Sequence, residues 1–97
     1  MPTHEETARF RDDWERLNPE QQVLFMAAVL EIVDDLSDRG RFRASLHVKE
    51  LHDHSGVFEL SWSGDGRATF QYEREKRPGD THILWRRVGG SEILDDP

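Results

Sequence analysis

The chain has 97 residues, with 13 Lys plus Arg against 20 Asp plus Glu, a formal net charge of −7 and no cysteine. This length fits one domain, residues 1–97, and excludes a large multidomain enzyme, while the lack of cysteine excludes disulfides, a thiolate nucleophile and cysteine-based zinc sites. The acidic balance also argues against a general nucleic-acid binder, because phosphates attract Lys and Arg.

The first predicted element is a helix over about residues 4–17. Thr3 and Glu6 have the spacing of a capping box, in which each side chain accepts a hydrogen bond from an otherwise unpaired N–H. Apolar positions then recur at helical spacing at Thr7, Phe10, Trp14 and Leu17.

A second helix is predicted over about residues 19–39. Asn18 is a good N-cap and Pro19 suits the first helical position, where no N–H donor is needed. Its core positions follow at helical spacing at Phe25, Val29, Ile32, Val33 and Leu36. Arg39 gives a basic last turn, and Gly40 can adopt the left-handed conformation that ends a helix. The one-residue link at Asn18 predicts an αα-hairpin.

After Gly40 the apolar period changes from 3.6 to 2, which indicates strands. The predicted strands cover about residues 45–50, 57–62, 67–72 and 82–88. Ser63 to Gly66 is a compact hairpin loop, and Glu73 to Asp80 is a polar loop. The predicted fold is therefore α+β, an N-terminal αα-hairpin packed on one face of a four-stranded, mainly antiparallel twisted sheet. Trp14, Trp62 and Trp85 follow the apolar pattern and are assigned to the core.

Arg67 is the first candidate site residue. It follows the hairpin loop on the strand face opposite Ala68 and Phe70, and an arginine fixed on a sheet can hold a phosphate through two parallel hydrogen bonds. The structural alternative is a cross-strand ion pair with Glu59 or Asp65.

Other titratable residues supply candidate bases and cations. The histidines His47, His52 and His54 lack a third ligand at a recognised zinc spacing, so neither a metal nor another cofactor is expected. One of these histidines or Glu50 is a candidate general base. The candidate phosphate-binding cations are Arg86, Arg87, Lys49 and Arg77.

Several segments resemble the RelE/ParE superfamily of bacterial toxins over about residues 7–94. They are Phe10-x-x-Asp13-Trp14-x-x-Leu17 with Pro19-Glu20-Gln21, and the strand segments 56–62, 66–70 and 84–89. The resemblance implies a small toxin held inactive by a cognate antitoxin. Many members cut mRNA in the ribosomal A site, with an arginine at the Arg67 position on the reacting phosphate, and the ParE branch inhibits DNA gyrase.

The sequence departs from that family at several positions. Glu59 and Ser61 stand where lysines are expected, Ser91 lies where a basic residue or histidine is expected, and no terminal tyrosine is present. The family's N-terminal edge strand is also not evident in the sequence. We therefore expect a diverged member with Arg67, Glu50 and His52 as catalytic residues.

The predicted function is a toxin-like, ribosome-dependent mRNA endoribonuclease that inhibits translation. Alternatives are a non-catalytic protein-interaction module with the same fold and a gyrase-directed inhibitor. The expected partners are a cognate antitoxin, the ribosome and mRNA, with self-association left open. The longest apolar run, residues 23–30, is far short of the ~20 residues that cross a bilayer, and the acidic N-terminus does not read as a secretory signal. A cytoplasmic protein without a membrane partner is expected.

Overall fold

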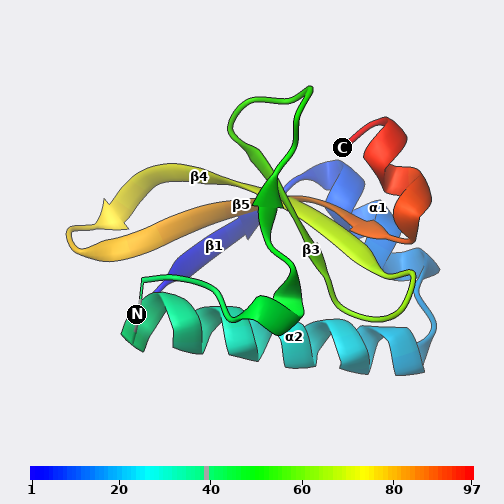
Figure 1. The fold of residues 1–97 in the computed structure, drawn as a ribbon, viewed down its shortest axis with the longest axis horizontal. Coiled ribbons are helices and arrows are strands. Elements are labelled where there is room, and N and C mark those ends of the chain that lie inside the picture. The colour runs from blue at the N-terminus through cyan, green and yellow to red at the C-terminus, as the bar shows by residue number, and fades with distance from the viewer. Residues whose placement is uncertain (39) are drawn as a thin grey trace.

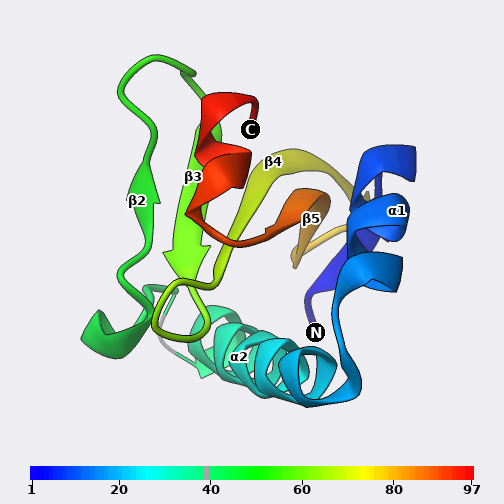
Figure 2. The ribbon, with the colours of Figure 1, turned by 90° about the vertical axis from the view of Figure 1, so that its right-hand side faces the viewer.

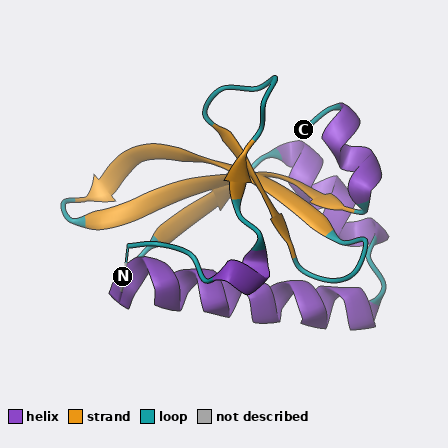
Figure 3. Cartoon of the chain, in the orientation of Figure 1, coloured by secondary structure: helices purple, strands orange, loops and turns teal. Residues whose placement is uncertain are grey.

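The computed structural model describes residues 1–38 and 40–97, and within them five strands form one mixed sheet. The strands are β1 (Thr3–Glu6), β2 (Lys49–Glu50), β3 (Val57–Ser61), β4 (Arg67–Arg77) and β5 (Asp80–Gly89). They lie in the order β1-β5-β4-β3-β2, and all neighbours are antiparallel except β1 and β5 (Figure 3). The predicted α+β class is confirmed, with one strand more than the four predicted.

The additional strand is β1, at the edge of the sheet. It pairs in parallel with β5, from Thr3 opposite His82 to Glu6 opposite Trp85. The Thr3 hydroxyl also lies 2.6 Å from the Nδ1 atom of His82. The prediction of a helix from about residue 4 is therefore wrong, and the edge strand that the sequence did not reveal is present. Its hydrogen-bond partners lie almost eighty residues away in the chain, whereas a helix-capping rule considers only residues a few positions apart.

The first helix, α1 (Ala8–Arg16), begins four residues later than predicted. Its N-cap is Thr7, whose hydroxyl oxygen accepts the N–H of Phe10 at 3.0 Å and donates to the main-chain oxygen of Arg86 at 2.8 Å. Thr7 therefore both starts the helix and ties it to β5.

The second helix, α2 (Pro19–Asp38), begins as predicted. The Asn18 and Gln21 side chains each accept the other residue's main-chain N–H at 2.8 Å, which completes a capping box. Gly40 has the expected left-handed conformation, with φ +69°. The predicted role of Arg39 and the predicted helix end at residue 39 lie outside the described residues.

The predicted strand over residues 45–50 is mostly absent. A 3-10 turn, η1 (Ala44–Leu46), comes first, and β2 contains only Lys49 and Glu50. The turn buries Leu46, which is 2 % exposed, in the core. His47 then adopts the left-handed conformation, with φ 49°, and this interrupts the extended chain. The apolar alternation in this region thus reflects burial of Leu46 by a turn.

The predicted polar loop over residues 73–80 is instead a paired extension of β4 and β5. The pairing continues from Glu73 opposite His82 to Arg77 opposite Asp80, and the turn consists of Pro78 and Gly79. Gly79 has φ +88°. The hairpin projects from the body of the protein (Figure 1), so most of its side chains are exposed and carry no apolar alternation that would have predicted strands.

The core lies between the sheet and the two helices. Figure 2 shows α2 running beneath the sheet and α1 beside β5. Phe25 of α2 is central, with ring centroids 5.8 Å from Phe10, 5.3 Å from Trp85 and 6.2 Å from Trp62. The predicted core positions of Trp62 and Trp85 are confirmed, and Trp14 packs against the margin of the core.

The chain ends in a 3-10 helix, η2 (Ser91–Asp95), which lies on the other side of the sheet from α2 (Figure 1). Its Ile93 is 2 % exposed and packs close to Gly89 of β5. None of the described helices combines the length and apolar character that a membrane span requires.

Candidate functional site

Polar side chains gather on the sheet face turned away from α2, which we call the outer face. Strand pairing sets Lys49 opposite Glu59 and Ser61 opposite Arg67. Because side chains alternate along a strand, these four project from the outer face, while the intervening Leu60 packs into the core. They line a cleft of about 460 Å³, here called the Arg67 cleft, which His47 and Val48 complete.

The Arg67 guanidinium is fixed by the hairpin loop that precedes β4. Its Nη1 atom donates to the carbonyl oxygens of Gly64 at 3.2 Å and Gly66 at 2.9 Å. Neither Nε nor Nη2 has a hydrogen-bond partner within the described residues. Within the described residues, Arg67 also forms no ion pair with Glu59, which pairs with Lys49, or with Asp65. Arg67 thus keeps a positioned, partly unoccupied donor set at the cleft.

Glu59 brings a buried carboxylate to the same cleft. The residue is 7 % exposed, and its Oε1 atom lies 3.3 Å from the ammonium of Lys49, whose side chain is 71 % exposed. The Oε2 atom has no hydrogen-bond partner in the described part of the chain, and neither does the buried hydroxyl of Thr69, the cross-strand neighbour of Glu59. Buried polar atoms are normally paired, so this nearly inaccessible oxygen leaves Glu59 with an unmet hydrogen-bond acceptor beneath the cleft.

His47 is held at the cleft by an unusual backbone conformation. Among the described residues it is the only one other than glycine with positive φ, and its N–H donates to the Ala44 carbonyl at 3.0 Å. Such a conformation costs an ordinary residue of order 1 kcal/mol and concentrates at functional sites. The exposed imidazole lines the cleft together with Arg67.

The structure does not bring the other two predicted catalytic residues to Arg67. Glu50 lies opposite Phe58, so strand alternation places it on the other sheet face, and its carboxylate accepts the N–H of Gly56 at 2.7 Å. His52 lies exposed in the loop between β2 and β3 and does not line the Arg67 cleft. Glu59 and His47 therefore line this cleft and Glu50 and His52 do not, while the catalytic roles of Glu50 and His52 stay predictions.

The paired arginines of β5 have protein partners. Arg87 Nε lies 2.7 Å from Asp13 Oδ2, and this hydrogen-bonded ion pair raises the pKa of Arg87. Arg86 donates to the side-chain oxygen of Gln71 and, at 3.1 and 3.2 Å, to the main-chain oxygen of Pro97. Neither arginine lines the Arg67 cleft.

Arg77 lies at the tip of the projecting hairpin, opposite Asp80, at the other end of β4 from Arg67 (Figure 1). Of the predicted catalytic and phosphate-binding residues, the structure thus brings only Arg67 and Lys49 together. The candidate site residues taken from the sequence did not include Glu59 and Ser61, but the hairpin loop could have revealed them. Closing of this loop sets which residues of β3 stand opposite β4. Within the described residues, no three His, Asp or Glu side chains gather closely enough to hold a metal ion.

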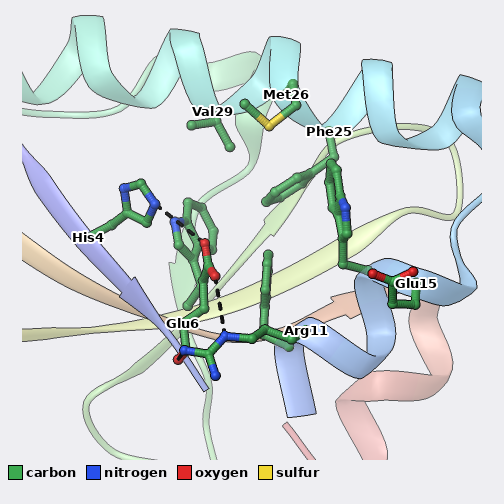
Figure 4. Close-up of a pocket in the computed structure, with 10 residues that line it drawn as sticks. His4, Glu6, Arg11, Glu15, Phe25, Met26 and Val29 are labelled. Atoms are coloured by element: carbon green, nitrogen blue, oxygen red, sulfur yellow. Dashed lines mark hydrogen bonds and ion pairs between the residues drawn. The ribbon is translucent and has the colours of Figure 1, made fainter. Parts of the chain in front are cut away.

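A second cavity, of about 280 Å³, lies between α1, α2 and β1 (Figure 4). Its lining is mainly apolar and comes from the core aromatic residues with Met26 and Val29 of α2. At its rim the Glu6 carboxylate lies 3.5 Å from the Nε2 atom of His4 and forms an ion pair with Arg11 at 3.7 Å. Met26 is 46 % exposed, and the exposed side chains of Val23 and Leu30 extend the apolar surface along α2. We call this cavity and the two flanking residues the helix-side surface.

The fold is that of RelE-type toxins. No model of a known protein family matches the sequence, and no curated protein is significantly similar to it. Among solved structures, the RelBE toxin–antitoxin complex of Escherichia coli is similar with a TM-score of 0.66 and 15% identity, over 93% of this chain and 96% of that one. YafQ of Escherichia coli gives 0.62 and 13%, over 97% and 98%. The RelBE2 complex of Mycobacterium tuberculosis gives 0.56 and 26%, over 93% and 99%.

Proposed function

We propose that this protein is the toxin of a toxin–antitoxin pair and that it stops translation by cutting mRNA on the ribosome. The observation that carries the proposal is the Arg67 cleft, in which an arginine with unoccupied donors and a buried carboxylate with an unpartnered oxygen line one opening. The fold supports it, because solved structures with this fold are named as toxins and toxin–antitoxin complexes.

In this proposal, each polar group of the cleft has a role in RNA cleavage by the 2′-hydroxyl. Glu59 takes the proton of the 2′-hydroxyl, whose oxygen forms a bond to phosphorus while the bond from phosphorus to the 5′-oxygen breaks. His47 in its protonated form gives a proton to the leaving 5′-oxygen. Arg67 and Lys49 stabilise the charge that develops on the phosphate. The products are a 2′,3′-cyclic phosphate and a 5′-hydroxyl.

Protein synthesis in a reconstituted translation reaction tests this function. The wild-type protein is expected to stop synthesis and to produce new mRNA ends in the ribosomal A site, mapped by primer extension. Arg67→Ala is expected to restore synthesis. Arg77→Ala is the matched control, because it removes the same side chain from the distant hairpin tip and is expected to leave cleavage unchanged.

Two results would contradict the proposal, one its nuclease activity and the other its site. Unchanged protein synthesis with intact mRNA would exclude the nuclease and favour the non-catalytic interaction module. If the protein then inhibits DNA supercoiling by gyrase, it is instead a gyrase-directed inhibitor. Cleavage by Arg67→Ala at the wild-type rate would remove the proposed role of the cleft. Circular dichroism of both variants checks that each is folded.

We also propose that an antitoxin binds the helix-side surface through a basic amphipathic helix. A partner's apolar side chain would fill the cavity beside Met26, and its neighbours would cover Val23 and Leu30. The exposed carboxylates of α1 and α2 favour basic residues beside that apolar stripe. Those without an ion pair in the described part of the chain include Glu15, Glu20 and Asp34.

If the gene next to this chain's gene encodes a small protein, co-expression with that protein tests the partner. Met26→Lys is expected to abolish co-purification, because it places a cation on the apolar stripe and repels a basic helix. Met26→Leu is the control and should retain the complex. Equal recovery with both variants would place the antitoxin elsewhere, and no complex with the wild type would remove the proposed partner.

A further inference from the structure

A second hollow continues from the Arg67 cleft toward α2. Its volume is about 600 Å³, and His47, Ser61 and Arg67 line both openings. Figure 2 shows the elements that enclose it, with η1 and the loop between β3 and β4 lying beside α2. The phosphate-binding groups of the cleft therefore stand at the entrance to a larger space.

The apolar part of this hollow comes from two sides. Leu24 and Ala27 of α2 face it from one side, and Leu46 and Trp62 line it from the body of the protein. The Trp62 indole is fixed, because its N–H donates to the main-chain oxygen of Arg67 at 2.9 Å. This hydrogen bond links the wall of the hollow directly to Arg67, the residue that would hold the phosphate.

Polar side chains make up the rest of the lining. The hydroxyl-bearing Ser45 and Ser63 line the hollow, as does Glu31, whose Oε2 atom is paired with Arg43 at 3.1 Å. A nucleobase has the complementary character, with two apolar faces and an edge of hydrogen-bond donors and acceptors. A lining of apolar and polar side chains, next to a cleft that contains Arg67 and Lys49, matches one nucleotide with its phosphate on Arg67.

We propose that this hollow, here called the base pocket, holds one unstacked nucleobase of a single-stranded RNA whose adjacent phosphate lies on Arg67. The proposal rests on the proposed nuclease function, which supplies RNA as the substrate. Leu24, Ala27, Leu46 and Trp62 contact the base, and Ser45 and Ser63 lie near its polar edge. His47 lies between base and phosphate because it lines both parts of the cleft. The base pocket is then the part of the protein that determines which nucleotide is cut.

Binding of two uncleavable RNA trinucleotides tests the base pocket. Both carry a 2′-deoxy central sugar, and one of them lacks the central base. The wild-type protein is expected to bind the base-bearing probe about tenfold more tightly, which is the size of a single base contact in single-strand binding proteins. Isothermal titration calorimetry at fixed, low salt measures both affinities.

The double variant Ala27→Leu and Ser45→Leu fills the pocket from two sides at exposed positions. It is expected to reduce the preference for the base to below about twofold while leaving the affinity for the abasic probe unchanged. The matched control, Ala8→Leu with Ser37→Leu, adds the same groups at exposed positions outside both hollows and should keep the wild-type preference.

The outcomes separate this inference from the function on which it rests. If the wild type binds both probes equally and Arg67→Ala weakens both, the phosphate site stands and the base pocket is overturned. The base pocket is also overturned if the filled variant keeps the wild-type preference. If neither probe binds the wild type, the phosphate contact of the proposed function is lost, and this inference is lost with it.

Discussion

Asp13 of α1 and Arg87 of β5 form a two-point ion pair, although 74 residues separate them in the chain. The Asp13 carboxylate accepts Nε of Arg87 at 2.7 Å and Nη2 at 3.1 Å. It also accepts the main-chain N–H of Val88 at 3.2 Å. The Asp13 and Arg87 side chains are only 5% and 14% exposed. One carboxylate therefore fixes α1 on the sheet and occupies a cation that the sequence had assigned to phosphate binding.

The first prediction is that Asp13→Asn strongly destabilises the fold. The substitution leaves Arg87 buried without its counter-charge, which lowers the free energy of unfolding by about 3 kcal/mol. Urea denaturation measures the change. Asp12→Asn is the control, since that neighbouring residue is exposed and should change stability by less than about 0.5 kcal/mol. Equal effects of the two variants would show that the ion pair does not hold the helix.

The second prediction concerns Gly66, against which the Trp62 ring packs. A Cβ atom at this position would lie 2.6 Å from the indole and 2.5 Å from the Ser63 hydroxyl oxygen. Gly66→Ala should therefore displace Trp62 and lower stability by about 1 to 3 kcal/mol. Thermal unfolding with near-ultraviolet circular dichroism reports both effects. Gly64→Ala meets no atom within 4 Å and should behave as the wild type.

The third prediction separates the catalytic contribution of Glu59 from its contribution to stability. Glu59→Gln keeps the size of the side chain and removes its buried charge, so stability should be unchanged or higher, because the lost partner, Lys49, is largely exposed. If Glu59 is the general base, mRNA cleavage falls by about a hundredfold or more. Cleavage rate and urea denaturation are measured on the same preparation.

Glu50→Gln is the control for Glu59, because the two substitutions make the same chemical change on opposite sheet faces. It should keep full cleavage activity. Wild-type cleavage by Glu59→Gln would exclude the carboxylate as the base, and loss of activity in Glu50→Gln would return that role to the residue that the sequence suggested.

The fourth prediction is that His47 combines backbone strain with function. Glycine adopts positive φ without penalty, so His47→Gly should raise stability by up to about 1 kcal/mol, or leave it unchanged, while cleavage falls. His47→Ala removes the same imidazole and retains the strain, so it should lose activity without the gain in stability. If both variants cleave as the wild type does, the left-handed position has no catalytic purpose.

Part of the fold could be predicted from short-range patterns. The start of α2 depends on Asn18 and Gln21, three residues apart, and the structure forms that capping box. The strand positions around residues 57–61 and 67–72 follow from alternation next to a short loop. The prediction for the N-terminal segment was wrong because Thr3 and Thr7 can each cap a helix. Only the pairing of β1 with β5 decides between them.

The candidate site likewise has a part that the sequence predicted and a part that it did not. The sequence by itself determined the α+β class, the core positions of Trp62 and Trp85, and Arg67 as a fixed cation after a hairpin, because each depends on residues close together in the chain. Only the tertiary structure decided that Glu59 and His47, not Glu50 and His52, accompany Arg67, and that Asp13 occupies Arg87. The reason is physical, since strand register and helix docking fix which distant side chains share a face, and a one-residue change in register moves every side chain to the other side.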